Sequence, residues 1–192
     1  MYKTARPDRK TEIVAHSATL FKEKGYSAVT MRDIAHSLDI KAASLYNHIT
    51  SKQEILSLVV LGIAREYTNT IEQIVSSNDT AVDKLKQVIA LHIDITVRNP
   101  DGLASLNNDW MHLPPDDLAL FLSMRESYEN YFRAIVKNGI ESGELRAFNA
   151  EVIIFSMLST LRTLYLWYGK KPEFSPEILH RDLPGILLEG LI

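Results

Sequence analysis

The 192-residue sequence predicts an all-α fold of about nine helices. Apolar residues recur at helical spacing along almost the whole chain, and no segment of convincing length alternates between apolar and polar residues as a strand does. Several Ser, Thr and Asn residues also precede apolar runs, where their side chains can cap a helix. The order of these elements predicts two domains, over residues 1–52 and 53–192.

The first domain is predicted to be a three-helix module. Its first helix covers residues 9–24 and stops at Gly25, a residue type that favours the position after a helix. Thr30 can cap a second helix over residues 31–38, and Asp33 can return the hydrogen bond in a capping box.

A short turn then leads to a third helix over residues 42–48. Asp39 and Ile40 form this turn, because Asp tolerates left-handed backbone better than most residues. Two short helices across such a turn, with a shared apolar core, make a helix-turn-helix. The predicted core residues are Ile34, Ala35, Leu38, Ile40, Leu45 and Ile49.

The second domain is predicted to consist of longer helices. A helix capped by Ser51 covers residues 52–76, and the next ends at Arg98. The run Asn99-Pro100-Asp101-Gly102 is read as a break. The remaining helices are expected over residues 103–111, from Pro115 to about Ile140, over residues 149–168 and from Ser175 onward.

The helix over residues 149–168 is apolar nearly all round, which indicates that one face meets another subunit. We therefore expect a homodimer whose interface is formed by the last two helices, residues 149–169 and 175–191. Leu183-Pro184-Gly185 interrupts the apolar pattern of the second of these helices.

Charge is distributed unevenly along the chain. Residues 1–52 hold nine Lys and Arg against five Asp and Glu, whereas the remainder holds 12 against 19. Only the N-terminal face is therefore expected to approach a polyanion such as DNA. The absence of cysteine excludes disulfides, thiolate nucleophiles and zinc–thiolate sites. No secretory signal and no membrane-spanning run is apparent, so we expect a cytoplasmic protein without membrane contact.

The stretch "GYSAVTMRDIAHSLDIKAASLYNHITSKQEIL" resembles the N-terminal module of the TetR-type bacterial transcriptional regulators, over about residues 9–56. The resemblance implies a homodimer that binds a palindromic operator in double-stranded DNA. It also implies a helical C-terminal domain that binds a small effector and dimerises through its last two helices. Two positions depart from the family: Asp39 replaces the usual Gly of the turn, and Lys41 replaces the usual Ser or Thr cap.

The C-terminal part, from "NPDGLASLNNDWMHL" through "MLSTLRTLYLWYGKK", is similar to TetR regulators of fatty-acid, steroid or aromatic-acid catabolism, many of which sense acyl-CoA thioesters. This likeness suggests a small hydrophobic effector such as an acyl-CoA, a fatty acid or an aromatic acid.

Residues of the helix-turn-helix are the candidates for DNA contact. The start of the second helix of such a pair reaches base edges in the major groove, which favours Lys41, Ala42, Ala43 and Asn47. Phosphate contacts, which hold register without reading sequence, are expected from Thr30, Tyr46, His48 and Lys52. The alternatives are core packing for Tyr46 and a solvated surface position for Lys52. Two interpretations are open for Lys3, Arg6, Arg9 and Lys10: an N-terminal arm that adds salt-dependent affinity for DNA, or an ordinary frayed terminus.

An effector pocket is expected among the helices between residues 84 and 168, with a few polar groups on otherwise apolar faces. The candidate residues are His92, Asn107, Trp110, Arg125, Tyr128, Arg162 and Tyr165. Each has core packing as its alternative. Arg162 lies among apolar neighbours and needs an anion, which is either a ligand group or a glutamate such as Glu129 or Glu151.

The alternative to a regulator is a protein of a different class, a small helical enzyme or ligand-binding protein that acts on a lipid or aromatic acid. The sequence has no recognisable Ser/His/Asp arrangement and no metal-binding spacing, and it predicts neither a cofactor nor a metal. A regulator that has lost its ligand is a third reading.

Overall fold

A computed structural model describes residues 8–171 and 173–192, and every regular element in these ranges is helical. This confirms the predicted all-α class and the number of helices. The elements are α1 (Arg9–Lys24), η1 (Tyr26–Ala28), α2 (Met31–Ser37), α3 (Ala42–Tyr46), α4 (Lys52–Ser76), α5 (Ala81–Arg98), α6 (Pro100–Asn108), η2 (Trp110–His112), α7 (Pro115–Glu141), α8 (Ala150–Tyr168) and α9 (Pro176–Leu188).

The described residues form two compact units. The first takes in the described residues up to Ile63 together with Asp101–Phe121, and the second consists of Ala64–Pro100 and the described residues of 122–192. The long helices α4 and α7 each contribute to both units. A functional boundary at residue 52 therefore falls at the start of α4 and stays a prediction.

In the first unit, α1 packs against η1 and α2, and α2 packs against α3. Their apolar side chains are removed from solvent, with Ile13, Phe21, Ile34, Leu45 and Ile49 all at 1% exposure or less. Of the predicted shared core, Leu38 and Ile40 are only half-buried. The remaining four predicted core residues are buried, so the helix-turn-helix rests on the core that the sequence indicated.

Two of the cationic residues assigned to an N-terminal arm belong to α1 instead. Arg9 pairs with Glu12, and Lys10 Nζ lies 2.7 Å from Glu54 at the start of α4. Lys3 and Arg6 lie outside the described residues.

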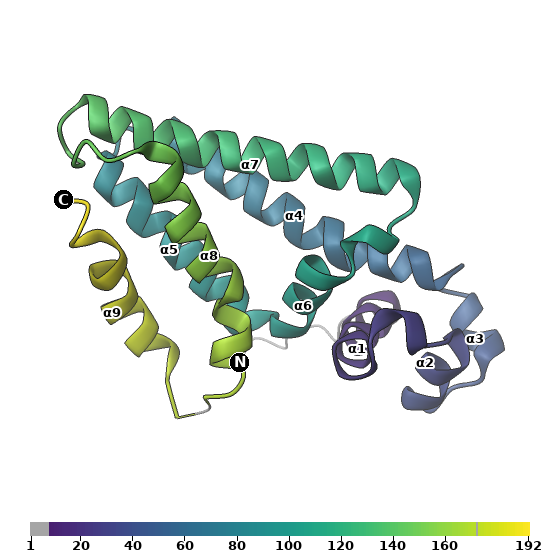
Figure 1. Cartoon of the computed structure of the whole chain (residues 1–192). Coiled ribbons are helices and arrows are strands. Elements are labelled where there is room, and N and C mark those ends of the chain that lie inside the picture. Colours follow the sequence, from purple (N-terminus) through teal and green to yellow (C-terminus); the bar gives the residue numbers. More distant parts are fainter. Residues whose placement is uncertain (1–7, 172) are drawn as a thin grey trace, which may run out of the picture. The chain divides into compact units, whose positions relative to one another are not determined.

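In the second unit, α5 packs against α8 and α9 (Figure 1). Ile71, Leu85, Ile89, Ile93 and Phe132 are among its fully buried side chains. Within the described part of the chain, α8 is the one helix long and apolar enough to cross a membrane by length and composition alone. Its packing against α5 is also what a core helix would show.

Two boundaries differ from the sequence-based expectation, at the start of α6 and at the end of α3. Helix α6 begins at Pro100 rather than at residue 103, because proline at the first helical position lacks only an N–H that the helix would not use. Helix α3 ends at Tyr46, and residues 47–48 continue as a hydrogen-bonded turn. Helix α9 continues through Pro184, where one backbone donor is missing.

Candidate nucleic-acid interface and effector site

The capping box predicted at Thr30 is present. The Thr30 hydroxyl accepts from the Asp33 amide at 3.2 Å, and the Thr30 amide donates to the Asp33 carboxylate at 2.8 Å. Hydrogen bonds from the Thr30 side chain and backbone lower the pKa of Asp33. The cap fixes the start of α2, and an exposed Thr30 lies at its N-terminus.

The turn between α2 and α3 is a Schellman-type C-cap. Asp39 has a φ of 52°, the only positive φ outside glycine among the described residues. The Asp39 amide donates to the His36 carbonyl at 3.1 Å, and the Ile40 amide donates to the Ala35 carbonyl at 3.0 Å. Asp39 therefore adopts the left-handed backbone conformation that was predicted for this turn.

Helix α3 presents most of the predicted DNA-contacting side chains to solvent. Lys41 is its N-cap and is exposed, and its ammonium, which only donates, cannot accept a capping bond. Tyr46 is 55% exposed, which excludes the core-packing alternative, while Leu45 beside it is fully buried. Ala43, Asn47 and His48 are exposed, and Ala42 is half-buried.

Lys52 is held more tightly than a surface lysine. Its Nζ donates to the Tyr26 carbonyl at 2.8 Å and to the Val29 carbonyl at 2.7 Å, and it lies 4.2 Å from the centroid of the Tyr26 ring. Burial lowers the pKa of Lys52, while the negative charge of Asp109 acts in the opposite direction. Two of the three ammonium donors are thus engaged within the first unit.

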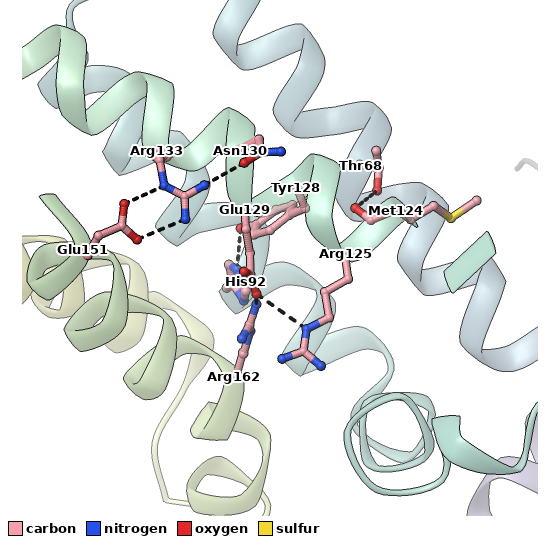
Figure 2. A network of polar contacts seen from close by, with 10 residues as sticks. All are labelled: Thr68, His92, Met124, Arg125, Tyr128, Glu129, Asn130, Arg133, Glu151 and Arg162. Atoms are coloured by element: carbon pink, nitrogen blue, oxygen red, sulfur yellow. Dashed lines mark hydrogen bonds and ion pairs between the residues drawn. The ribbon is translucent and has the colours of Figure 1, made fainter. Parts of the chain in front are cut away.

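In the second unit, His92 lies between the hydroxyls of Tyr67 and Tyr128, and Figure 2 shows its contact with Tyr128. Its Nε2 atom is 2.8 Å from the Tyr128 hydroxyl, and its Nδ1 atom is 3.3 Å from the Tyr67 hydroxyl. Burial, reinforced by the positive charge of Arg162, lowers the pKa of His92 to about 3. Burial raises the pKa of both tyrosines. The three groups are therefore uncharged at neutral pH and satisfy one another.

Next to this triad, two arginines share one carboxylate (Figure 2). Arg162 Nη2 donates to Glu129 Oε1 at 2.6 Å, and Arg125 Nε lies 3.5 Å from the same oxygen. Burial favours a higher pKa for Glu129, but the two arginines hold it below its usual value. Glu151, the other partner considered for Arg162, is instead held by Arg133 at 2.6 and 3.0 Å.

The remaining effector candidates are dispersed. Tyr165 is buried on α8, one turn from Arg162. Asn107 and Trp110 belong to the first unit, where Asn107 donates to the Leu103 carbonyl and the Trp110 ring packs near Phe121. No cluster of three or more potential metal ligands occurs among the described residues.

Sequence reasoning missed Tyr67 and the carbonyl partners of Lys52. A buried histidine signals that hydrogen-bonding partners exist. It does not indicate which helix supplies them, because Tyr67 lies 25 residues from His92 in the chain. The carbonyl partners of Lys52 are likewise 23 and 26 residues away from it.

Known sequences and structures match both parts of the chain. The pattern of bacterial regulatory proteins of the tetR family matches residues 13–59, and that of the tetracyclin repressor-like C-terminal domain matches residues 78–191. The helix-turn-helix and the matches define a DNA-binding transcriptional repressor. The chain belongs to the TetR family of bacterial transcriptional regulators, which are not enzymes.

Individual relatives extend this likeness over the full chain. The HTH-type transcriptional repressor KstR2 of Rhodococcus jostii (strain RHA1) is 23% identical over 98% of this chain and 93% of the relative. The solved ketosteroid transcriptional regulator KstR2 of Mycobacterium tuberculosis has a TM-score of 0.89 at 20% identity, over 99% of this chain and 96% of that one. AibR, solved with isovaleryl coenzyme A and operator DNA, has a TM-score of 0.80 at 19% identity, over 96% and 100%. These structural matches establish the shared fold.

Proposed function

We propose that the protein is a homodimeric repressor whose affinity for a palindromic operator is set by a small effector with an apolar body and an anionic group. The observation that carries the effector part is the pair Arg125 and Arg162 sharing Glu129. Among the described residues, two guanidinium groups share this one carboxylate, which gives the cluster a net positive charge beside a neutral and buried polar triad.

In this proposal α3 reads the major groove. Lys41 donates to a guanine edge, Asn47 pairs with adenine, and Ala42 and Ala43 meet thymine methyl groups. The exposure of Lys41 and Ala43 at the start of α3, and of Asn47 just beyond its end, supports this assignment, and Ala42 beside them is half-buried.

Phosphate contacts are assigned to Thr30, Tyr46, His48 and Lys52. Tyr46 and His48 are exposed at the end of α3, and Thr30 lies at the N-terminus of α2, where the helix dipole favours an anion. Lys52 retains one ammonium donor for a phosphate after its two carbonyl contacts.

The dimer interface is assigned to α8 and α9. One face of α8 is exposed along its whole length, with Val152 and Phe155 at one end and Leu166 and Trp167 at the other. Ile186 on α9 is 73% exposed. Exposed apolar side chains of this size on helices of a monomer favour burial against another subunit.

The exposed face of α8 is also self-complementary. Its middle holds the small residues Ser156, Ser159, Thr160 and Thr163. The hydroxyls of both threonines donate to backbone carbonyls of their own helix. If the α8 helices of two subunits pack antiparallel and cross near Thr160, their small residues allow the two backbones to approach closely there. The apolar N-terminal end of each helix then lies against the apolar C-terminal end of its partner.

For the effector, the two-arginine cluster would receive a carboxylate or a phosphate, and the triad with Tyr165 would border the apolar part. AibR was solved with isovaleryl coenzyme A, and KstR2 is named as a ketosteroid regulator. These two similar proteins support a coenzyme A thioester as the first class of effector to test. Fatty and aromatic acids present the same carboxylate chemistry. Because its proposed operator is double-stranded DNA, the protein is proposed to work in the cytoplasm.

Thermal unfolding in the presence of each effector class tests this proposal. A ligand at 100 times its Kd should add about 2.7 kcal/mol of stability, roughly 5–11 °C in Tm. A shift with coenzyme A thioesters that also weakens operator binding supports the effector part of the proposal. Unchanged Tm values with thioesters, fatty acids and aromatic acids would refute it.

The dimer assignment is tested by cross-linking, since the chain contains no cysteine. A Thr160→Cys variant should form a disulfide-linked dimer under mild oxidation. A Thr70→Cys variant on α4 is the control and should remain monomeric in denaturing electrophoresis. Equal cross-linking of both variants would overturn the assignment.

A further inference from the structure

The turn before α2 is held by side chains from later in the chain. Its carbonyls at Tyr26 and Val29 both accept from Lys52, the first residue of α4. Thr30, which follows Val29, is the N-cap of α2. Any displacement of this turn would therefore tilt the start of α2, against which α3 packs.

The ring at the centre of this turn is covered by η2. Tyr26 is 6% exposed, and its ring packs edge-on against Phe21, with centroids 5.0 Å apart. His112, at the end of η2, stacks on the same ring with centroids 5.1 Å apart and an interplanar angle of 24°. An exposed histidine from a segment over 80 residues away thus covers the turn that leads into α2.

The other end of the same segment is attached to α1. Asp101, in the first turn of α6, accepts from the Thr19 hydroxyl at 2.7 Å and from Lys22 Nζ at 2.7 Å. These two bonds join α6 to α1, which packs against η1 and α2. Burial favours a higher pKa for Asp101, but its two partners hold it below its usual value.

We propose that Asp101 and His112 are positioning residues for DNA binding: together they brace α1 and the turn before α2, and so set the angle at which α2 and α3 meet the duplex. Neither belongs to the helix-turn-helix, and neither is assigned a contact with DNA. They occupy the two ends of one short segment, residues 101–112, and contact two different elements of the recognition module.

The direction in which operator affinity changes when Asp101 is replaced distinguishes a positioning role from a purely electrostatic one. Asp101 is negative and neutralises Lys22, so its removal should strengthen nonspecific attraction to a polyanion. A positioning role predicts the opposite for the specific site, because a misaligned α3 loses base contacts, each of which discriminates strongly against a wrong base.

The test measures binding of the full-length protein to its operator duplex and to a scrambled duplex, across a range of salt concentrations. Asp101→Ala and His112→Ala should each weaken operator binding about tenfold, the scale of one lost base contact. The slope of log K against log salt should stay as in the wild type, since no phosphate contact is lost. Scrambled-duplex affinity should be unchanged, or higher for Asp101→Ala.

Two matched variants serve as controls. Glu23→Ala removes a negative charge from α1 at an exposed position with no ion pair among the described residues, and should not weaken operator binding. His112→Phe keeps a flat ring against Tyr26 and should restore wild-type affinity.

Operator affinity of Asp101→Ala equal to that of Glu23→Ala would overturn the assignment of Asp101. Equal affinities for His112→Phe and His112→Ala would overturn that of His112. If Asp101→Ala is unfolded by circular dichroism, Thr19→Val, which removes one of the two bonds, takes its place with the same expected direction.

Discussion

The imidazole Nε2 of His92 lies 2.8 Å from the hydroxyl of Tyr128, in a site where the histidine is 4% exposed. Because Tyr67 occupies the other ring nitrogen, no solvent is needed to satisfy this side chain. Burial and the positive charge of Arg162 favour the neutral imidazole, which donates from one nitrogen and accepts at the other.

Protonation of His92 should therefore unfold the second unit. The pKa of His92 is about 3 in the folded protein and near its ordinary value of 6.5 when unfolded. The unfolded state binds the proton first, so stability is complete above pH 6.5 and is lost as pH falls toward 3, by at most about 1.4 kcal/mol per pH unit. Urea unfolding between pH 7 and 5 measures this slope. His92→Gln should flatten it and His16→Gln, at an exposed position, should not; identical slopes in all three proteins would contradict the assignment.

Gly139 should not tolerate a side chain. A Cβ at this position would lie 2.7 Å from Leu145 Cδ1 and 2.8 Å from Ala81 Cβ. Gly139→Ala should destabilise the protein by about 1–3 kcal/mol, although alanine favours helix. Gly62→Ala is the matched control, because a Cβ there has no neighbour within 4 Å, and it should stabilise by about 0.5–1 kcal/mol. Chemical denaturation of both variants checks the opposite signs.

Asp39→Gly should stabilise the helix-turn-helix. Asp39 has a φ of 52°, which an L-residue adopts at a cost that glycine avoids. We expect a gain of up to about 1 kcal/mol, visible as a higher Tm with unchanged operator specificity. Asp39→Val, with a branched side chain at the same φ, should lower the Tm; an equal Tm for the two variants would show that this turn is not strained.

Glu129→Gln should strengthen binding of an anionic effector. If the ligand anion replaces Glu129 on Arg162, removal of the internal carboxylate abolishes that competition. Isothermal titration should show tighter binding for the variant and weaker binding for Arg162→Met. An uncharged amide or ester of the same ligand is the control and should bind both variants alike. A loss of anion affinity in Glu129→Gln would indicate that Glu129 orients the arginines.

Local sequence signals predicted the helix-turn-helix in detail. The capping box at Thr30 and the left-handed Asp39 each depend on residues within five positions of one another, so the local sequence is enough to predict them. The same local reasoning failed at residue 99, because Asn-Pro-Asp-Gly is also compatible with a helix that begins at its proline.

Long-range partners could not be predicted. Helical periodicity indicates which face of α4 or α5 is buried but not which residue it meets, and so Tyr67 was not connected with His92. For Arg162 the sequence left two glutamates open, and only the packing of α7 beside α8 selects Glu129. The roles of Asp101 and His112 were invisible for the same reason.

Because residues 101–112 brace the helix-turn-helix, residues 1–52 alone are not a unit that can be exchanged between regulators. A chimera that joins residues 1–52 to another regulator's C-terminal half would leave Asp101 and His112 behind, and with them the contacts to Thr19, Lys22 and Tyr26. Recombination that transfers DNA specificity between such proteins would have to move two separate gene segments together, or find a recipient whose own segment fits the incoming turn.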